Sequence, residues 1–473
     1  MTAVPPTPLV ILHLGLGSFH RAHQAVFLQR LLDAGDARWV LHSGNIRGGS
    51  EGVVAALMAQ DGVYTLETVS PGGERRYQRI DAIRRVLPWD PTLAAVREAG
   101  ASPQTRIISF TVTEAGYYLD ETDRLEVTAP EISADLAAAR TGGAGTTIYG
   151  ALAAIFRERM RNGAGGVTLL NCDNLRHNGA RARAGLVQFV TALGDDAMLQ
   201  WLQTNTSSPS AMVDRITPRP SPEVAIRVRA ATGRTDMAAL MAESFIQWVI
   251  EEDFIAGRPP WETVGVEMVE SVAPYEEAKI RLLNATHGCV AWAGALAGHL
   301  HVHDSVRDPW IRGVAHDYVT DDAIPALSPS PVDLPAYRDL VLERFGNAGV
   351  PDTNQRITSD SFAKLSGFVA PTVRDRLSGD ESIEAVAMLP ALFLAFLQRW
   401  HQGALPFAYQ EQVADLALAR AICADADPVA ALAAQARVWG SLAGDERLRA
   451  AIRRAAARVA AFEAGPRRDQ EIT

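Results

Sequence analysis

The sequence predicts an α/β protein in which a doubly wound amino-terminal domain precedes a mostly α-helical carboxy-terminal domain. Short apolar runs alternate with helical patterns in the first half, and a glycine-containing loop follows the first of these runs. Beyond about residue 275, apolar residues recur with a helical period of roughly 3.6. We therefore expect one domain over residues 1–272 and a second over residues 273–473.

In the first half, each expected strand is a short apolar or β-branched run bounded by Gly, Pro or charged residues. The expected strands cover residues 9–14, 39–43, 105–112 and 166–170, with a helix over residues 23–34. In the second half, long helical patterns cover residues 383–400, 410–424, 428–442 and 445–462. The proline-rich residues 323–335 should not continue a helix, and the tail from Pro466 should fray.

Composition narrows the range of functions. The 473 residues are 48% hydrophobic and 21% charged, as in a globular protein, and a net charge of −10 argues against nucleic-acid or anionic-membrane surfaces. A small-molecule partner is expected instead. Three distant cysteines encode neither a disulfide framework nor a zinc knot, which fits a cytoplasmic location. The longest apolar run, 385–397, contains Pro390 and is too short to span a bilayer, and no basic residue precedes Arg21 as a secretory signal would require.

The loop after the first strand has the pattern G-x-G-x-F-H at residues 15–20 and opens a helix. Two glycines allow a tight turn and close approach of a pyrophosphate to backbone N–H groups, which predicts a Rossmann-like dinucleotide site. The third glycine of the usual motif is replaced by His20, so a plain strand-to-helix turn remains an alternative. The expected contacts are Gly15, Leu16, Gly17 and Phe19.

The second strand should end beside the adenine ribose, where an acidic residue would select NAD. No acid stands there. Asn45 can bond a ribose hydroxyl, Arg47 can accept a 2′-phosphate or stack on adenine, and Glu51 can supply a carboxylate from the next loop. The choice between NAD and NADP stays open at this point.

Polar residues that directly follow a strand are candidates for ligand binding, because ligands of open parallel sheets bind at the carboxyl ends of strands. The first two clusters contain Thr113, Glu114 and Asn174; the others supply charges from Asp214, Arg356 and Lys364. Singly, an Asn after a strand can be a helix cap, and each charged residue can be a surface ion pair.

Lys279, Asn284 and His287 fall on one face of a helix-compatible run, within an arc of roughly 140° if each residue turns about 100°. A desolvated lysine loses its proton more readily and can act as a general base, while Asn and His donate to substrate oxygens. The pattern therefore suits alcohol oxidation. An ordinary amphipathic helix with a solvated lysine is the alternative.

Six ordered motifs carry a resemblance that spans residues 15 to about 371. They are G-x-G-x-F-H-R-A-H at 15–23, T-x-T-E-x-G-Y at 111–117, C-D-N at 172–174, M-V-D-R-I-T-P at 212–218, P-Y-E-x-x-K-x-R-L-L-N-x-x-H at 274–287, and R-I-x-x-D at 356–360 followed by Lys364. With these motifs the chain resembles the polyol-specific long-chain dehydrogenases/reductases, the mannitol dehydrogenase family.

The resemblance implies an NAD(P)-dependent, metal-independent oxidation of a sugar alcohol to a ketose. It implies that Lys279 is the general base, that Asn174 and Asn284 hold the reactive oxygen, and that Glu276 helps the released proton toward water. The residues expected to contact the polyol are His287, Asp214, Arg356 and Lys364. Several stretches look closest to the D-arabinitol 4-dehydrogenase branch, with mannitol 2-dehydrogenases and hexuronate reductases as alternatives. Ser210, Ala211 and Ser366 depart from the family pattern and leave substrate preference open.

Three rival interpretations remain. Tyr275 and Lys279 match the Y-x-x-x-K pair of short-chain dehydrogenases, but chains of that family are far shorter. A zinc alcohol dehydrogenase would need ligand spacing that the cysteines lack, and His299, His301 and His303 look like a helix-end cluster. A non-catalytic nucleotide-binding protein is the third possibility. The exact polyol and the oligomeric state are left open.

Overall fold

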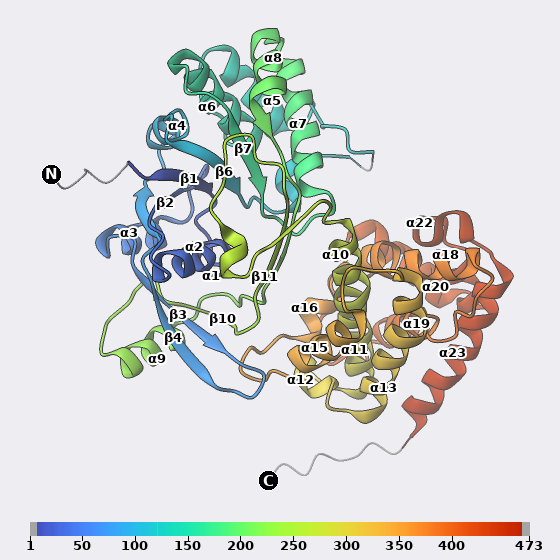
Figure 1. Cartoon of the computed structure of the whole chain (residues 1–473). Coiled ribbons are helices and arrows are strands. Elements are labelled where there is room, and N and C mark those ends of the chain that lie inside the picture. Colours follow the sequence, from blue (N-terminus) through green and yellow to red (C-terminus); the bar gives the residue numbers. More distant parts are fainter. Residues whose placement is uncertain (1–6, 121, 466–473) are drawn as a thin grey trace. The chain divides into compact units, whose positions relative to one another are not determined.

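The computed structural model describes residues 7–120 and 122–465 (Figure 1). The chain divides into two compact units. The first takes the described residues up to Ser70 and the segment Glu74–Ala273, and the second takes Pro71–Gly73 and the described residues from Pro274 onward.

The first unit contains a six-stranded sheet with strand order β5-β2-β1-β6-β7-β8. All five neighbouring pairs are parallel. Its strands are β1 (Leu9–Leu14), β2 (Trp39–Gly44), β5 (Ile83–Leu87), β6 (Thr105–Phe110), β7 (Val167–Asn171) and β8 (Thr206–Ser207). The order runs outward in both directions from the β1–β6 pair, which is the arrangement of a doubly wound dinucleotide-binding fold. The structure thus confirms the predicted fold class of this half.

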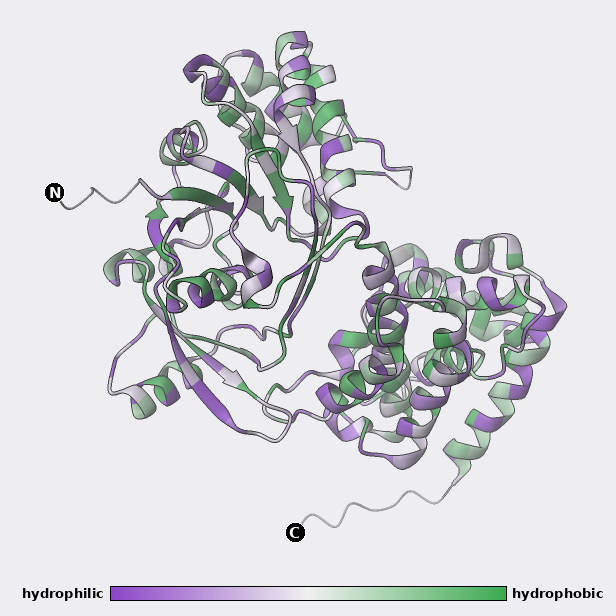
Figure 2. Cartoon of the chain, in the orientation of Figure 1, coloured by the Kyte–Doolittle hydropathy of each residue, from purple (hydrophilic) through white to green (hydrophobic). Residues whose placement is uncertain are grey.

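Helices cover both faces of this sheet. Leu12 and Leu14 of β1 pack in the core formed with α4–α8, whereas Ile11, directly before Leu12, packs in the core formed with α1–α3. Side chains therefore alternate between two buried faces, which is why the strands are apolar throughout. Figure 2 shows the central strands largely in green. The helices are α1 (Ser18–Ala22), α2 (Gln24–Asp33), α3 (Glu51–Ala59), α4 (Ala94–Gly100), η1 (Glu114–Tyr117), α5 (Pro130–Arg140), α6 (Ile148–Asn162), α7 (Asn178–Leu193), α8 (Asp196–Asn205), α9 (Pro222–Thr232) and η2 (Trp261–Val264).

Two small sheets that the sequence did not predict complete the first unit. One has the order β10-β3-β4 and the other the order β12-β11-β9. Their strands are β3 (Tyr64–Val69), β4 (Arg75–Ile80), β9 (Ala211–Asp214), β10 (Leu240–Glu243), β11 (Gln247–Glu251) and β12 (Glu267–Val269). Each mixes a parallel with an antiparallel pairing. The residues of β4 show little alternation between buried and exposed positions, and the strand is mostly purple in Figure 2. Its sequence therefore lacks the run of apolar residues from which strands were predicted elsewhere in the chain.

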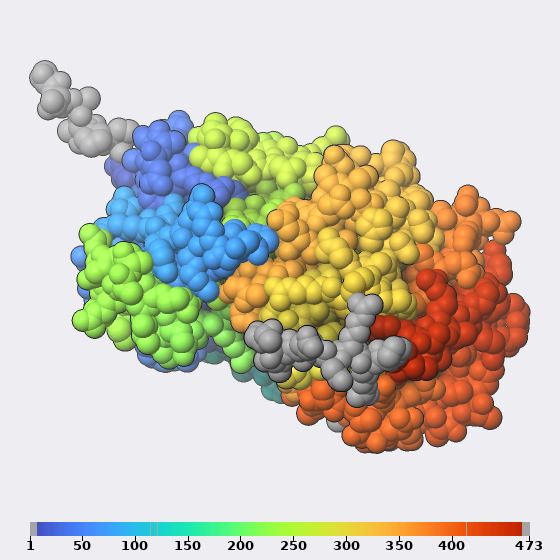
Figure 3. Space-filling model, turned by 90° about the horizontal axis from the view of Figure 1, so that it is seen from below, coloured from blue at the N-terminus to red at the C-terminus, as the bar shows by residue number. Residues whose placement is uncertain are grey.

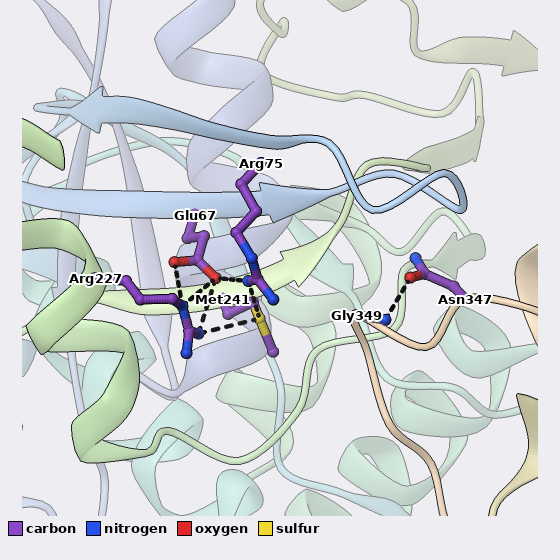
Figure 4. Close-up of polar contacts among 6 residues, drawn as sticks. All are labelled: Glu67, Arg75, Arg227, Met241, Asn347 and Gly349. Atoms are coloured by element: carbon purple, nitrogen blue, oxygen red, sulfur yellow. Dashed lines mark hydrogen bonds and ion pairs between the residues drawn. The ribbon is translucent and has the colours of Figure 1, made fainter. Parts of the chain in front are cut away.

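A buried carboxylate fastens the β10-β3-β4 sheet to α9 (Figure 4). Glu67 of β3 is completely buried. It accepts hydrogen bonds from Arg75 of β4 and from Nε and Nη2 of Arg227 on α9, the two Arg227 distances being 2.9 Å. The sulfur of Met241 on β10 lies 3.7 Å from both guanidinium groups. The carboxylate therefore has charged partners from two directions, as a buried ion requires.

The second unit is helical, and its core is formed largely by α11 and α19. Trp292 of α11 and Phe393 of α19 meet with ring centroids 5.3 Å apart, and α23 packs on α19 through one apolar face. The helices are α10 (Ala273–Ala278), η3 (Lys279–Asn284), α11 (Ala285–Ala297), α12 (Val302–Ser305), α13 (Pro309–Asp317), η4 (Tyr318–Ala323), α14 (Ile324–Leu327), α15 (Leu334–Phe345), α16 (Asn354–Thr358), α17 (Ser361–Lys364), η5 (Leu365–Val369), α18 (Ala370–Ser378), α19 (Met388–His401), α20 (Val413–Ala424), α21 (Pro428–Ala433), α22 (Ala436–Trp439), η6 (Gly440–Leu442) and α23 (Glu446–Ala464). Over the described residues, no helix combines the length and the apolar character needed to cross a membrane.

Three helical predictions for this half need correction. The proline-rich residues 323–335 contain α14 and the start of α15. Pro325 and Pro335 each stand in the first turn of a helix, where the backbone N–H that proline lacks would make no helical hydrogen bond. The single helix expected over residues 428–442 is broken into α21, α22 and η6. The helix expected from residue 383 begins only at Met388. The tail from Pro466 lies outside the described residues.

We expect Glu67→Gln to lower the free energy of unfolding of the first unit by about 1–3 kcal/mol, because two arginines lose their buried counter-charge. Calorimetry or urea unfolding monitored by circular dichroism would measure the change. Glu74→Gln is the matched control, since the Glu74–Arg76 pair is exposed and should contribute less than about 0.5 kcal/mol. Equal effects of the two variants would contradict a stabilising role for the buried carboxylate.

Candidate active site

The loop between β1 and α1 lies where the strand order of the large sheet reverses, which is where doubly wound sheets bind ligands. Gly15 has a φ of +117°, and a Cβ there would lie 2.4 Å from the carbonyl oxygen of Thr111, so only glycine fits. Gly17 is the N-cap of α1, and a Cβ built on it would meet no atom closer than 3.9 Å. The backbone is therefore open to a phosphate on this side.

Two stacked imidazoles occupy the position where the usual third glycine would allow close helix–strand packing. The rings of His13 on β1 and His20 on α1 are 3.5 Å apart and nearly parallel. His13 is hydrogen-bonded to the Ser109 hydroxyl at 2.8 Å, and His20 to the Ser43 hydroxyl at 3.1 Å. Burial lowers the pKa of His13 to about 3 and that of His20 well below its usual value. Both rings are thus neutral at pH 7, and the stack carries no charge repulsion.

Two of the predicted cofactor contacts face the protein rather than the open side of the loop. The Leu16 side chain is 1% exposed, and its N–H donates to the Asn45 side-chain oxygen at 2.7 Å. Phe19 is half-buried and stacks on His23 at 5.0 Å. Leu16 and Phe19 therefore shape the loop, and Asn45 ties it to the end of β2.

Beyond β2, the residues expected to select the cofactor already have partners. Arg47 donates from Nε to the Thr146 carbonyl at 2.6 Å and from Nη2 to the Tyr118 hydroxyl at 3.1 Å. Glu51 opens α3 and accepts from the Gly49 N–H at 2.7 Å. This hydrogen bond lowers the pKa of the Glu51 carboxyl, which is ionised at neutral pH. The loop after β2 thus carries one engaged guanidinium and one exposed carboxylate.

The loop after β6 is fixed by Asp173, which follows β7 and is buried. Its carboxylate accepts from the N–H groups of Val112 and Thr113 and from the Tyr117 hydroxyl. Burial raises the pKa of Asp173, although these hydrogen bonds act against the rise. Thr113 is held with a φ of +66°, a conformation that non-glycine residues seldom adopt. The predicted contact Glu114 begins η1, and its side chain lies outside the described part of the chain.

Asn174 and Asp214 follow β7 and end β9, respectively. Asn174 is exposed and Asp214 is buried. Asn178 connects the two segments, because its side-chain nitrogen donates to the carbonyls of Asp173 and Ala211 while its oxygen accepts from the Ala211 N–H. A single carboxamide therefore sets the position of both predicted substrate contacts within the first unit.

In the second unit, Lys279 and Asn284 are the first and last residues of a π-helix, η3. The expected arc assumed the α-helical turn of 100° per residue, and this assumption is wrong here. A π-helix bonds residue i to residue i+5, so the wider turn places Asn284 nearer above Lys279 than an α-helix would. Lys279 is 7% exposed and Glu276, one turn earlier, is 5% exposed. The predicted base is thus buried, as its proposed chemistry requires.

Hydrogen bonds between Arg281 of η3 and three other residues hold this π-helix in place. Arg281 donates from Nε to Glu277 at 2.9 Å and from Nη1 to Asp375 at 2.5 Å. The Tyr318 hydroxyl donates to the Arg281 carbonyl at 2.9 Å and is completely buried. Irregular helical segments leave backbone groups that need such partners. Tyr318 itself begins a second π-helix, η4, and the third, η5, starts directly after Lys364.

His287, Arg356 and Lys364 gather around a residue that the sequence did not single out, Asp352. Arg356 donates from Nε to Asp352 at 2.7 Å and also from Nη2. The His287 Nε2 atom lies 3.7 Å from the same carboxylate, and its ring stacks on Phe345 at 4.5 Å. Lys364 donates to the carbonyls of Ile357 and Ser359.

Burial controls the charges in this group. It lowers the pKa of His287 to about 4, so the imidazole is neutral at pH 7. Burial also lowers the pKa of Lys364. For Asp352, burial acts to raise the pKa, but the Arg356 hydrogen bond and the nearby positive charges outweigh it and leave the pKa lowered. A neutral imidazole beside an ion pair can both donate to and accept from hydroxyl groups.

Models of the mannitol dehydrogenase Rossmann domain and the mannitol dehydrogenase C-terminal domain match residues 9–263 and 271–460. D-arabinitol 4-dehydrogenase of Ralstonia nicotianae is 56% identical over 97% of this chain and 98% of its own, and that of Klebsiella pneumoniae is 49% identical over 95% and 97%. The structure of Pseudomonas fluorescens mannitol 2-dehydrogenase with NAD and D-mannitol matches with a TM-score of 0.80 at 30% identity, covering 97% of this chain and 93% of that one. These matches confirm the resemblance, and the chain belongs to the mannitol dehydrogenase family.

Proposed function

We propose that this chain is an NAD-dependent polyol dehydrogenase that oxidises D-arabinitol at C4 to D-xylulose. The observation that carries the proposal is the 56% identity to a D-arabinitol 4-dehydrogenase over nearly the full length of both chains. Oxidation of D-mannitol at C2 is the second candidate, favoured by the fold shared with mannitol 2-dehydrogenase at 30% identity. The proposal assigns dinucleotide binding to residues 1–272 and the base to residues 273–473.

The residues of the first unit fit a dinucleotide. The open backbone beside Gly17 suits a pyrophosphate, and Asn45 keeps a side-chain amide for a ribose hydroxyl. Thr113 and Glu114 follow β6 across the point where the strand order reverses. Arg47 is engaged and Glu51 is ionised, which disfavours a 2′-phosphate and supports NAD over NADP. When bound, the nicotinamide accepts the hydride from the carbinol carbon.

Lys279 is proposed to take the hydroxyl proton through its neutral amine, leaving a ketose once the carbon loses its hydride. Asn174 and Asn284 are proposed to stabilise the developing alkoxide, and Glu276 to pass the proton from Lys279 toward water. The neutral imidazole of His287, with Asp214, Arg356 and Lys364, is proposed to bind the remaining hydroxyls. No metal ion takes part in this reaction.

Lysine usage supports this assignment. The chain has 45 basic residues other than histidine, and only two of them, Lys279 and Lys364, are lysines. Arginine remains protonated in proteins, whereas lysine can lose its proton when it is buried. In a chain whose basic residues, apart from Lys364 and histidine, are otherwise all arginines, a buried lysine at residue 279 is therefore informative.

We also propose a cytoplasmic location and a small-molecule polyol partner, with no nucleic-acid or membrane partner. The described residues contain three free cysteines and no helix that could cross a bilayer. The net charge of −10 disfavours anionic partners.

We expect Lys279→Arg to reduce kcat by about 10²–10⁴ while the fold and NAD binding persist, because arginine keeps the charge but cannot accept the proton. Lys364→Arg is the matched control. It keeps a cation that can bond the same carbonyls, and it should change KM more than kcat. Stopped-flow absorbance of NADH would give both constants.

The same two-lysine sequence allows a direct titration. Incorporating lysine labelled with ¹³C at Cε gives two side-chain signals, and Lys279→Arg assigns them. Because Lys279 is buried, its amine should titrate below the usual lysine value of about 10.4. An ordinary lysine pKa at this position, or wild-type turnover by Lys279→Arg, would exclude Lys279 as the base.

We expect Tyr318→Phe to destabilise η3 and reduce turnover about tenfold or more, since the Arg281 carbonyl loses its buried partner at a cost of about 1–3 kcal/mol. Tyr149→Phe is the matched control, because its hydroxyl also donates to a buried carbonyl, that of Tyr117, at 2.9 Å in the first unit. Both variants should lose similar stability. Only Tyr318→Phe should accelerate hydrogen exchange over residues 279–285 and shift the Lys279 titration. If the two variants behaved alike in both measurements, the Tyr318 hydroxyl would contribute only to the overall stability of the protein.

A substrate panel tests the proposed reaction itself. D-arabinitol, D-mannitol, D-sorbitol, xylitol and a hexuronate would each be paired with NAD and with NADP, and kcat/KM would be measured from absorbance. We expect the highest value with D-arabinitol and NAD, with D-xylulose identified as product by chromatography. A higher value with D-mannitol would favour the second candidate, and inactivity with every polyol despite NAD binding would contradict the enzyme assignment.

A further inference from the structure

A group of metal-ligating side chains lies in the second unit, outside the residues assigned to the reaction. His301, His303 and Asp304 lie at the start of α12, and each offers one ligand atom within 4.8 Å of those of the other two. His303 Nε2 is 3.4 Å from Asp304 Oδ1, and His301 Nδ1 is 3.7 Å from Asp304 Oδ2. Among the residues that the structure describes, no other group of three His, Cys, Asp or Glu side chains meets this spacing.

The spacing matches what a small divalent ion requires. Tetrahedral zinc binds imidazole nitrogen and carboxylate oxygen at about 2.0–2.2 Å, which places its ligand atoms roughly 3.3–3.6 Å apart. The three side chains therefore need to move by about 1 Å or less to share one ion. Two imidazoles and one carboxylate leave a fourth position for water, and imidazole prefers zinc, cobalt, nickel or copper over magnesium or calcium.

The backbone beneath the ligands is fixed by a neighbouring segment. The Val302 N–H donates to the Asp352 carbonyl at 2.9 Å, and the Asn354 N–H donates to the Leu300 carbonyl at 2.9 Å. The Asn354 side chain adds a bond to the His299 carbonyl at 3.0 Å. A preformed backbone lowers the ordering cost of binding, because the ligands lose less freedom when an ion arrives.

The side chains are also available to an ion from solvent. Their exposed fractions are 38% for His301, 14% for His303 and 37% for Asp304. Atoms coloured yellow, the colour of residues near 300, form part of the surface in Figure 3. Within the described part of the chain, the buried His303 Nδ1 has no hydrogen-bond partner, so this ring is not committed to another residue through that atom.

We propose that His301, His303 and Asp304 bind one divalent transition-metal ion of the zinc class. The ion links side chains within residues 301–304 and takes no part in the proposed dehydrogenation. Without an ion, Asp304 would simply pair with the two imidazoles and with Arg307, whose Nη1 lies 3.6 Å away. The two interpretations differ in one measurable respect, which is saturable binding of a metal that depends on all three side chains.

Isothermal titration of the tag-free full chain with Zn²⁺ tests the proposal, with Cys423→Ser as background because that thiol is partly exposed. We expect one ion per chain. His303→Ala should weaken binding at least thirtyfold and Asp304→Asn at least tenfold. His299→Ala, which removes a neighbouring imidazole outside the group, should change affinity less than twofold.

Two further readouts complete the test. Co²⁺ should give the intense visible absorption of a tetrahedral site in the background protein and lose it in His303→Ala. Saturating Zn²⁺ should raise the melting temperature of the background protein but not that of His303→Ala. Absence of saturable binding, or equal binding by His303→Ala and His299→Ala, would overturn the site. If chelation abolished turnover in the background protein but not in His303→Ala, the claim that the ion takes no part in the reaction would be wrong.

Discussion

The burial of the Lys279 amine is the physical constraint on which the proposed chemistry depends. A charged ammonium in a low-dielectric interior is costly, and the cost falls when the group gives up its proton. In the proposed reaction, the burial of Lys279 therefore favours the neutral amine that a general base requires. The fold must also prevent the side chain from escaping to water. The anchored π-helix meets this need, since Arg281, two residues on, is tied through its side chain to Glu277 and Asp375 and through its carbonyl to Tyr318.

The first unit meets a different constraint, which is to keep a backbone loop open where the strand order of the sheet reverses. Gly15 is confined by Thr111, while Gly17 stays uncovered. The usual motif would add a third glycine for close helix–strand packing. Here the stacked His13 and His20 rings fill that space, and burial keeps them uncharged. The loop therefore lacks the third glycine of the usual motif, and packing of the two histidine rings takes its place between the helix and the strand.

Most of the large sheet could be predicted from the sequence because its strands are buried on both faces and are therefore apolar along their whole length. β1 has the predicted bounds, β2 and β6 differ from them by one or two residues at one end, and β7 is shifted by one residue, whereas β5 and β8 were not predicted. β4 could not be predicted, since a strand rich in arginine carries no apolar pattern. The breaks among α21, α22 and η6 were hidden for the opposite reason, because an alanine-rich stretch is compatible with one long helix.

The candidate site was predictable to the extent that it rests on local motifs. Lys279, Asn284 and His287 share one run, but the π-helix that contains the first two depends on distant partners such as Tyr318. Asp352 was missed because a single Asp four residues before an Arg is common on surface helices. Its importance comes from His287, which is 65 residues earlier in the chain and reaches it only in the folded unit.

If His287, Arg356 and Lys364 contact the substrate as proposed, the charges around Asp352 bear on the class of substrate. Asp352 occupies two donor positions of Arg356, and Lys364 donates to two backbone carbonyls, so both cations have strong partners before any ligand arrives. A hexuronate would need a free cation to bind its carboxylate with two parallel hydrogen bonds, and it would have to displace Asp352 from Arg356 to obtain one. A neutral polyol has no such need, because its hydroxyls can use the uncharged His287 ring and the remaining donors of Arg356 and Lys364. The electrostatics of this group therefore favour a sugar alcohol over a sugar acid.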